Sequence, residues 1–147
     1  MNHHFSWTAK SAALGLFFVL LVSTLSAQER RIYSADGIDY ATGITVDDSH
    51  VYWTERGSGR VRRVAKTGGA VTDYVAAHED RMAEFVAVGD SDVYWTDTTG
   101  GYDGRLRRVS TGGGEVDDLA LGVLGPAGVL LTDSHVYWAQ FEGVYRL

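Results

Sequence analysis

Short runs of alternating apolar and polar residues recur along the chain, separated by turns that contain Gly, Asp or Ser. The segments 44–47, 51–54, 61–65 and 71–76 form one set of four such runs. Strands favour β-branched and aromatic residues with a period of two, and turns favour the residues that separate these runs. No stretch after residue 27 shows the 3.6-residue period of a helix. The pattern predicts an all-β fold of short antiparallel strands.

This set of runs is repeated along the sequence. Trp53, Trp95 and Trp138 mark its second run and are 42 and 43 residues apart. Such a period is typical of propeller blades built from four strands. We therefore expect a β-propeller fold of about three blades, each with four antiparallel strands, in repeats of about 43–84, 85–127 and 128–147.

The third repeat contains only three of the four runs. Its expected strands are 129–132, 136–139 and 144–147. The segment 31–35 precedes the strand at 44–47 by the distance at which a fourth strand precedes the next repeat elsewhere. We expect this segment to complete the third blade, since propellers protect their exposed strand edges in this way.

Turns between the first and second strands carry a repeated Asp-Ser pair. These pairs are Asp48-Ser49, Asp90-Ser91 and Asp133-Ser134, and His50 and His135 follow two of them. Asp and Ser side chains bond the backbone two residues further on, so we expect turn chemistry here. A metal site is disfavoured, because blade symmetry would spread these groups apart.

The second strand of each repeat carries a recognisable motif. It is complete in Tyr94-Trp95-Thr96-Asp97, has Glu for Asp in Tyr52-Trp53-Thr54-Glu55, and keeps the aromatic pair in Tyr137-Trp138-Ala139-Gln140. Over residues 31–147 the chain resembles the YWTD-type, low-density-lipoprotein-receptor class B-like β-propellers and their bacterial extracytoplasmic relatives. The resemblance implies a six-bladed ring, of which this chain supplies three repeats, and implies that Glu55 and Asp97 tie the second strand to the next loop.

The aromatic pairs are expected to be structural. Adjacent residues of a strand point to opposite faces, so each pair would pack against both neighbouring blades. The structural motif expected from these repeats comprises Tyr52, Trp53, Thr54, Tyr94, Trp95, Thr96, Asp97, Tyr137 and Trp138.

Three repeats leave the apolar faces of the outermost blades uncovered, because a repeat unit cannot bury its faces alone. Two expectations follow and both stay open. Two copies join as a homodimer that completes a six-bladed ring, or the chain is a fragment of a longer six-bladed propeller protein.

Residues 1–27 have the pattern of a secretory signal peptide. Lys10 precedes an apolar run at 11–25, and Ser26-Ala27 offers a small-residue exit. We expect residues 28–147 to form the partial β-propeller of an extracytoplasmic protein, either periplasmic or secreted. The alternative is an uncleaved signal, which would be the only membrane association of the chain.

Composition excludes several classes of function. The sequence has no cysteine, which rules out disulfides, thiolate zinc sites and a cysteine nucleophile. The formal net charge of −6 disfavours nucleic-acid binding. The basic stretches 60–63 and 105–108 are expected to pair with neighbouring acids on exposed strand faces, and a basic binding stripe is the alternative.

Function is expected in the loops that follow the second strand and precede the first strand of the next blade. These loops are acidic with two aromatic groups, and the candidate ligand-face residues are Glu55, Arg56, His78, Asp80, Asp97, Tyr102, Asp103, Phe141 and Glu142. A binding or scaffold module for a protein, peptide or glycan is expected, with no cofactor, no metal and no catalytic residue. The alternative is a metal-dependent lactonase- or lyase-type enzyme, which is disfavoured because residues 28–147 contain no Asn.

Overall fold

The computed structural model describes residues 37–100 and 103–147. They belong to one of the two units into which the chain divides, residues 31–147. The signal predicted at 1–27 and the strand predicted at 31–35 lie outside the described residues. Every regular element of the described part is a β-strand, and no helix long and apolar enough to cross a membrane occurs there.

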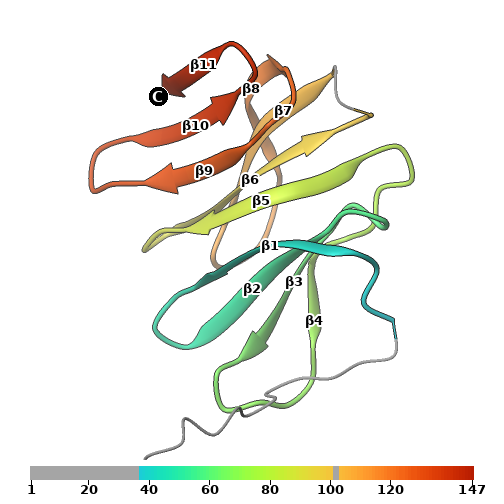
Figure 1. Cartoon of the computed structure of the whole chain (residues 1–147). Coiled ribbons are helices and arrows are strands. Elements are labelled where there is room, and N and C mark those ends of the chain that lie inside the picture. Colours follow the sequence, from blue (N-terminus) through green and yellow to red (C-terminus); the bar gives the residue numbers. More distant parts are fainter. Residues whose placement is uncertain (1–36, 101–102) are drawn as a thin grey trace, which may run out of the picture. The chain divides into compact units, whose positions relative to one another are not determined.

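The described strands form three antiparallel sheets, which we call blades 1, 2 and 3 (Figure 1). The strands follow one another within each sheet in chain order, so each blade is a simple meander. Blade 1 contains β1 (Ala41–Val46), β2 (His50–Glu55), β3 (Arg60–Ala65) and β4 (Thr72–Val75). Blade 2 contains β5 (Met82–Val88), β6 (Asp92–Thr98), β7 (Gly104–Ser110) and β8 (Asp117–Val123). Blade 3 contains β9 (Gly128–Leu131), β10 (Val136–Gln140) and β11 (Gly143–Arg146). The predicted all-β fold of about three propeller blades is confirmed.

The first strand of blades 1 and 2 begins three or four residues earlier than the apolar alternation predicts. The pairing register shifts between Ala41 and Ile44 in β1, and between Ala83 and Val86 in β5. An irregularity of this kind interrupts the period of two, so the sequence pattern becomes visible only after it.

Successive blades pack face to face, and each blade has two different faces. We call the side that packs on the next blade the forward face and the opposite side the rear face. Tyr52 and Val61 on the forward face of blade 1 share a core cluster with Val86, Val93 and Trp95 of blade 2. A second cluster joins blade 2 to blade 3 and contains Leu106, Val123 and Trp138. Burial of these apolar side chains stabilises the stack by about 1.5–3 kcal/mol for each large group.

Hydrogen bonds between β1, β2 and β5 hold blades 1 and 2 close together at their first strands. The hydroxyls of Thr42 and Thr54 each donate to the carbonyl of Glu84, both at 2.8 Å. A Cβ on Gly43 would lie 2.8 Å from the Thr54 hydroxyl and 2.9 Å from the Glu84 carbonyl. Glycine at this position therefore permits the close approach of β5.

Candidate functional site

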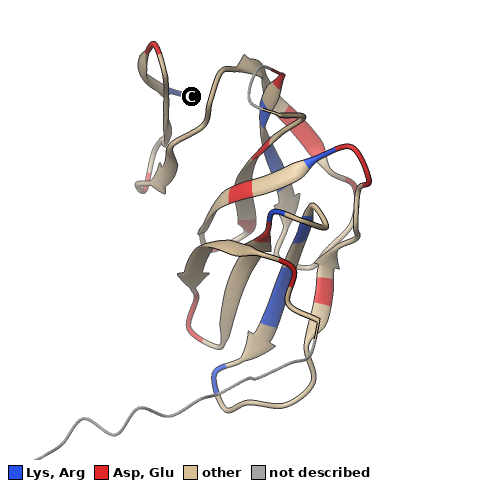
Figure 2. Cartoon of the chain, turned by 45° about the vertical axis from the view of Figure 1, so that its right-hand side comes forward, with Lys and Arg blue, Asp and Glu red and all other residues tan. Residues whose placement is uncertain are grey.

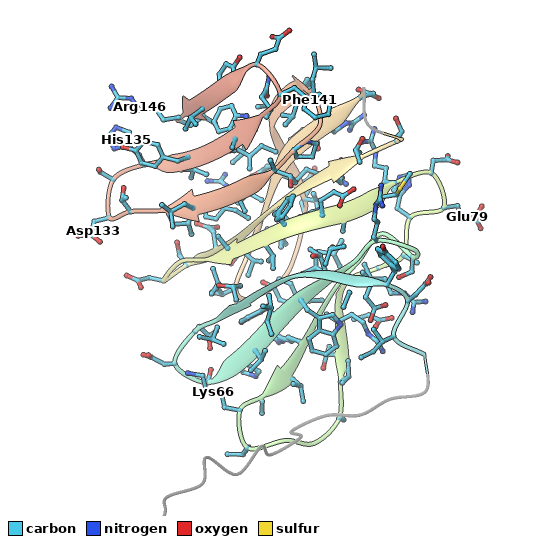
Figure 3. The ribbon with its side chains drawn as sticks, viewed as in Figure 1. Lys66, Glu79, Asp133, His135, Phe141 and Arg146 are labelled. Atoms are coloured by element: carbon cyan, nitrogen blue, oxygen red, sulfur yellow. The ribbon has the colours of Figure 1, made fainter. Side chains whose placement is uncertain are left out.

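The loops predicted to carry function meet at one end of the blades. The amide of His78, between β4 and β5, donates to the carbonyl of Ser58 in the β2–β3 loop at 3.1 Å. The amide of Phe141, between β10 and β11, donates to the Leu124 carbonyl of the β8–β9 connection at 2.9 Å. We call this the loop end and the opposite side the turn end. Figure 3 shows Glu79 at the loop end and Asp133 and His135 at the turn end.

Most of the candidate ligand-face residues are exposed at the loop end. The exposed members are His78, Asp80, Asp103, Phe141 and Glu142. Phe141 is 79% exposed, a large value for an aromatic side chain. Arg56 is half-buried, and its Nε donates to the Glu84 carboxylate at 3.0 Å. Tyr102 lies outside the described residues.

Two grooves run between neighbouring blades at the loop end. The first, of about 560 Å³, lies between blades 1 and 2 and is lined by Asp39, Tyr40, Arg56, Gly57, Glu79, Asp80, Arg81, Met82 and Thr99. The second, of about 420 Å³, reaches blade 3 and is lined by Arg56, Glu84, Phe85, Thr98, Gly100, Gly125, Pro126, Ala127 and Phe141. Arg56 lines both grooves, and Glu84, with which it forms an ion pair, lines the second.

Glu55 is buried rather than presented to a ligand. Its carboxylate accepts hydrogen bonds from the Trp53 indole at 3.0 Å, from Arg62 at 3.1 Å and from Ser58 at 3.1 Å. Burial alone would raise the pKa of Glu55, but the hydrogen bonds from Trp53, Arg62 and Ser58 outweigh it and hold the pKa below its ordinary value. The Ser58 contact ties the end of β2 to the following loop, as the family resemblance implies.

Asp97 is the equivalent residue of blade 2 and is buried as well. Arg81 donates to one carboxylate oxygen at 2.8 Å and Arg107 to the other at 3.1 Å. Only 3% of the Asp97 side chain and 8% of the Arg81 side chain are exposed. The structure therefore buries both carboxylates within their blades, and they do not contribute to the candidate ligand face.

The arginines of β3 and β7, whose backbone is blue in Figure 2, contact side chains of neighbouring strands in blades 1 and 2. Arg62 lies over the Trp53 ring at 6.0 Å and pairs with Asp73 on β4 at 2.9 Å. Arg107 lies over Trp95 at 5.6 Å and pairs with Asp118 on β8 at 2.7 Å. The other arginines of these strands, Arg60, Arg105 and Arg108, also pair with acids as expected. Arg63 does not: it lies over the Tyr74 ring at 4.8 Å and donates to the Thr111 carbonyl. All six guanidinium groups therefore have partners, which argues against a free basic stripe.

The turns between the first and second strands form the expected hydrogen bonds to the backbone, but a different side chain accepts them. In the first turn the acceptor is Asp47, one residue earlier, whose carboxylate receives the amides of Ser49 at 2.7 Å and His50 at 2.6 Å. Tyr52 donates its hydroxyl to the same carboxylate at 2.7 Å. Burial opposes ionisation here, but these hydrogen bonds lower the pKa of Asp47 to about 2.

The two other turns have different residues at the position of Asp47. Thr132 holds the position of Asp47 in blade 3 and accepts the His135 amide at 3.2 Å, whereas blade 2 has Gly89 there. The position whose side chain accepts the backbone amide in blades 1 and 3 varies among the repeats, whereas the Asp-Ser pair that follows it is the same in all three. The repeated pair therefore did not identify the acceptor. No three His, Asp or Glu side chains among the described residues gather closely enough to hold a metal ion.

Tyr40 is a loop-end residue that sequence reasoning missed. It is 68% exposed, lines the first groove, and is the non-glycine residue of the described part with a positive φ, at 59°. It precedes the first repeat, so no repeated pattern marks it. The sequence feature that could have identified it is its position next to Asp39, just before the first strand.

Comparisons with known proteins find similarity in structure but not in sequence. No protein-family model matches the chain, and no match to a curated protein reaches significance. The fold is similar to a chain of a crystallised nidogen/laminin complex, with a TM-score of 0.41 and 15% identity over 75% of this chain. The match covers 61% of that chain, so this protein spans less than two thirds of it. The computationally designed Ika4 protein is similar with a TM-score of 0.46 and 11% identity, over 82% of this chain and 98% of that one.

Proposed function

We propose that the chain is an exported β-propeller repeat protein of the YWTD type, which binds a polypeptide segment carrying Lys or Arg at its loop end. The observation that carries the ligand assignment is the grouping of exposed acidic and aromatic side chains around the first groove. Asp39, Glu79 and Asp80 provide negative charge there, and Tyr40 provides an exposed ring. Acidic groups beside an aromatic face attract ammonium and guanidinium groups by charge and by cation–π contact.

Membership of the YWTD type is supported by what each motif residue does. The Trp donates its indole N–H to the residue two positions on, which is Glu55 in blade 1 and Gln140 in blade 3. The motif glycines are also required sterically, because a Cβ on Gly59 or Gly104 would lie 2.3 Å or 2.2 Å from a backbone carbonyl. The indole hydrogen bonds of blades 1 and 3 and the steric need for glycine in blades 1 and 2 give these motif residues structural roles, which supports the family assignment.

Binding is tested with the purified protein and a fluorescent lysine-rich peptide as the probe. Glu79→Gln combined with Asp80→Asn removes two loop-end charges, and we expect at least about tenfold weaker binding, with a strong salt dependence in the wild type. Asp48→Asn combined with Asp133→Asn removes the same charge at the turn end and is the matched control. If both double variants bind the peptide equally weakly, net charge alone explains the effect, and this would contradict a loop-end site. Salt-independent binding of a neutral oligosaccharide, with no peptide binding, would replace the polypeptide ligand by a glycan.

The export part of the proposal depends on residues 1–27 and has its own test. Expression in a bacterial host followed by fractionation should place the protein outside the cytoplasm, with a new N-terminus near Gln28. A Lys10→Glu substitution removes the positive charge that precedes the apolar run and should slow processing. An intact Met1 on cytoplasmic protein would contradict export and leave the binding proposal standing.

A further inference from the structure

Repeat-equivalent positions differ sharply in burial at the two ends of the blade stack. Val61 and Leu106, on the forward faces of blades 1 and 2, are fully buried, whereas Val144, their equivalent in blade 3, is 76% exposed. On the rear faces, Val86 of blade 2 is 7% exposed, but its equivalent Ile44 in blade 1 is 73% exposed. Val144 and Ile44 are therefore apolar although no described part of the chain covers them.

Each of these two faces exposes a further apolar residue, although Trp53 and Val64 on the rear face of blade 1 are buried. Val46 lies two residues after Ile44 on the rear face of blade 1 and is 53% exposed. Leu130 is paired with Tyr137 on the forward face of blade 3 and is 65% exposed. Apolar patches of this kind mark interaction surfaces in soluble proteins.

We propose that the forward face of blade 3 binds the rear face of blade 1 of a second copy, so that two chains close one ring. The pairing repeats the two interfaces already present in the chain, in which a forward face always covers a rear face. Because the two open faces differ, the contact is head to tail, and such contacts are finite only when they close. Closed propellers have about four to eight blades, and two copies of three blades are the multiple within that range.

Arg146 supplies an independent contact for this pairing. Its equivalent in blade 1 is Arg63, which donates to the carbonyl of Thr111 in blade 2 at 3.4 Å. The residue equivalent to Thr111 in blade 1 is Lys66, in the turn after β3. Arg146 and Lys66 are both exposed, and Figure 3 shows both side chains projecting outward. In the ring, Arg146 of one copy donates to the Lys66 carbonyl of the other.

The test measures the mass in solution of the purified full chain and of two single variants. The wild type should have twice the mass of one chain at micromolar concentration. Ile44→Asp and Val144→Asp each place a carboxylate in both interfaces of the ring, and each should weaken association at least about 100-fold. Leu121→Asp is the matched control, because Leu121 is 70% exposed but lies on the outer strand of blade 2. It should leave the mass unchanged.

The pattern of dissociation separates this ring from other assemblies. Loss of association in only one of the two variants would mean that like faces pair, and would overturn the head-to-tail ring. Growth of the wild type into open filaments, or a well-folded wild-type monomer, would overturn it too.

Mixing Ile44→Asp with Val144→Asp leaves one of the two interfaces free of substitutions, so partial recovery of the dimer is expected. Arg146→Ala should weaken association modestly, by about three- to tenfold, while far-UV circular dichroism confirms that all variants are folded.

Discussion

Blades 2 and 3 share an aromatic frame but differ in how it is supported. In blade 2, Trp95 lies beneath Arg107, and buried Asp97 binds both Arg107 and Arg81. In blade 3, Trp138 stacks on Tyr145 with ring centres 5.6 Å apart, and its indole donates to uncharged Gln140. Both blades keep a buried tryptophan with another side chain over its ring, but the charged groups that surround Trp95 have no counterpart around Trp138.

The difference shows which parts of the motif depend on neighbours. Arg107 needs Asp97 beside it and Asp118 on β8, and Asp97 needs Arg81 from the connection before β5. Among the described residues, blade 3 has no strand in the place of β8, so an arginine at position 145 would lack that acid. A ring stacked on a ring requires no counter-charge. The paired charges thus occur in the two blades that have four described strands, while a side chain lies over the tryptophan ring in all three described blades.

The largest effect should come from removing the buried tryptophan of blade 2. Trp95→Ala takes out a side chain that is 1% exposed at the centre of the first core cluster, and about 3–5 kcal/mol of unfolding free energy should be lost. Urea unfolding followed by circular dichroism measures it. Phe141→Ala, at an exposed aromatic, is the control. Equal midpoints for the two variants would place Trp95 outside the core.

The buried acid of blade 2 should matter more than its neutral counterpart in blade 3. Asp97→Ala leaves Arg81 and Arg107 without their shared partner and should cost about 2–4 kcal/mol. Gln140→Ala removes one hydrogen bond from Trp138 and should cost about 1 kcal/mol. Chemical denaturation of both variants gives the two costs. A larger loss at Gln140 would reverse the comparison between the blades.

The same substitution at two equivalent valines tests the coverage of the blade faces. Val61→Ala should cost about 2 kcal/mol, because Val61 is fully buried. Val144→Ala should change the unfolding free energy of the dissociated chain by less than about 0.5 kcal/mol, because Val144 is mostly exposed there. Denaturation is measured at a concentration low enough for the wild type to be monomeric. Similar losses at both sites would mean that another segment covers Val144.

The turn carboxylate of blade 1 should make the stability of the protein depend on pH. The folded pKa of Asp47 lies at about 2, below the value of 3.8 for an unperturbed aspartate. Its contribution to stability is therefore complete above about pH 4 and is lost as the pH falls toward 2, an effect of about 1–2 kcal/mol. Asp47→Asn should lose this part of the acid sensitivity, and Asp48→Asn should retain it. Urea midpoints at pH 5 and pH 2.5 measure the difference, and equal acid sensitivity in all three proteins would contradict it.

Most of the fold could be predicted from the sequence because the repeats put the same residue types at the same places. The apolar–polar alternation around Trp53, Trp95 and Trp138 was enough to predict the strands, their grouping into blades and the burial of these three tryptophans. The burial of Glu55 and Asp97 could not be predicted by position, since a carboxylate after a strand is usually solvated. What buries Asp97 is Arg81, which lies in a connection that carries no repeated pattern.

The difference between exposed and covered equivalents also escapes a sequence argument. Val61 and Val144 are both valines at the same repeat position, but among the described residues a further blade covers Val61 and none covers Val144. Loop-end chemistry was predicted in part, because Phe141 and Asp80 stand out as charged or aromatic loop residues. Tyr40 was missed because it lies before the first repeat.

Backbone hydrogen exchange in the wild type and in Val144→Asp tests most directly whether open faces of two copies meet. We expect the variant to exchange at least about tenfold faster in β1 and in β9–β11, while β6 and β7 in the middle of the stack stay equally protected in both proteins. Identical exchange in β1 and β11 of the two proteins, or a uniform increase that includes β6 and β7, would contradict the pairing of the forward face of blade 3 with the rear face of blade 1.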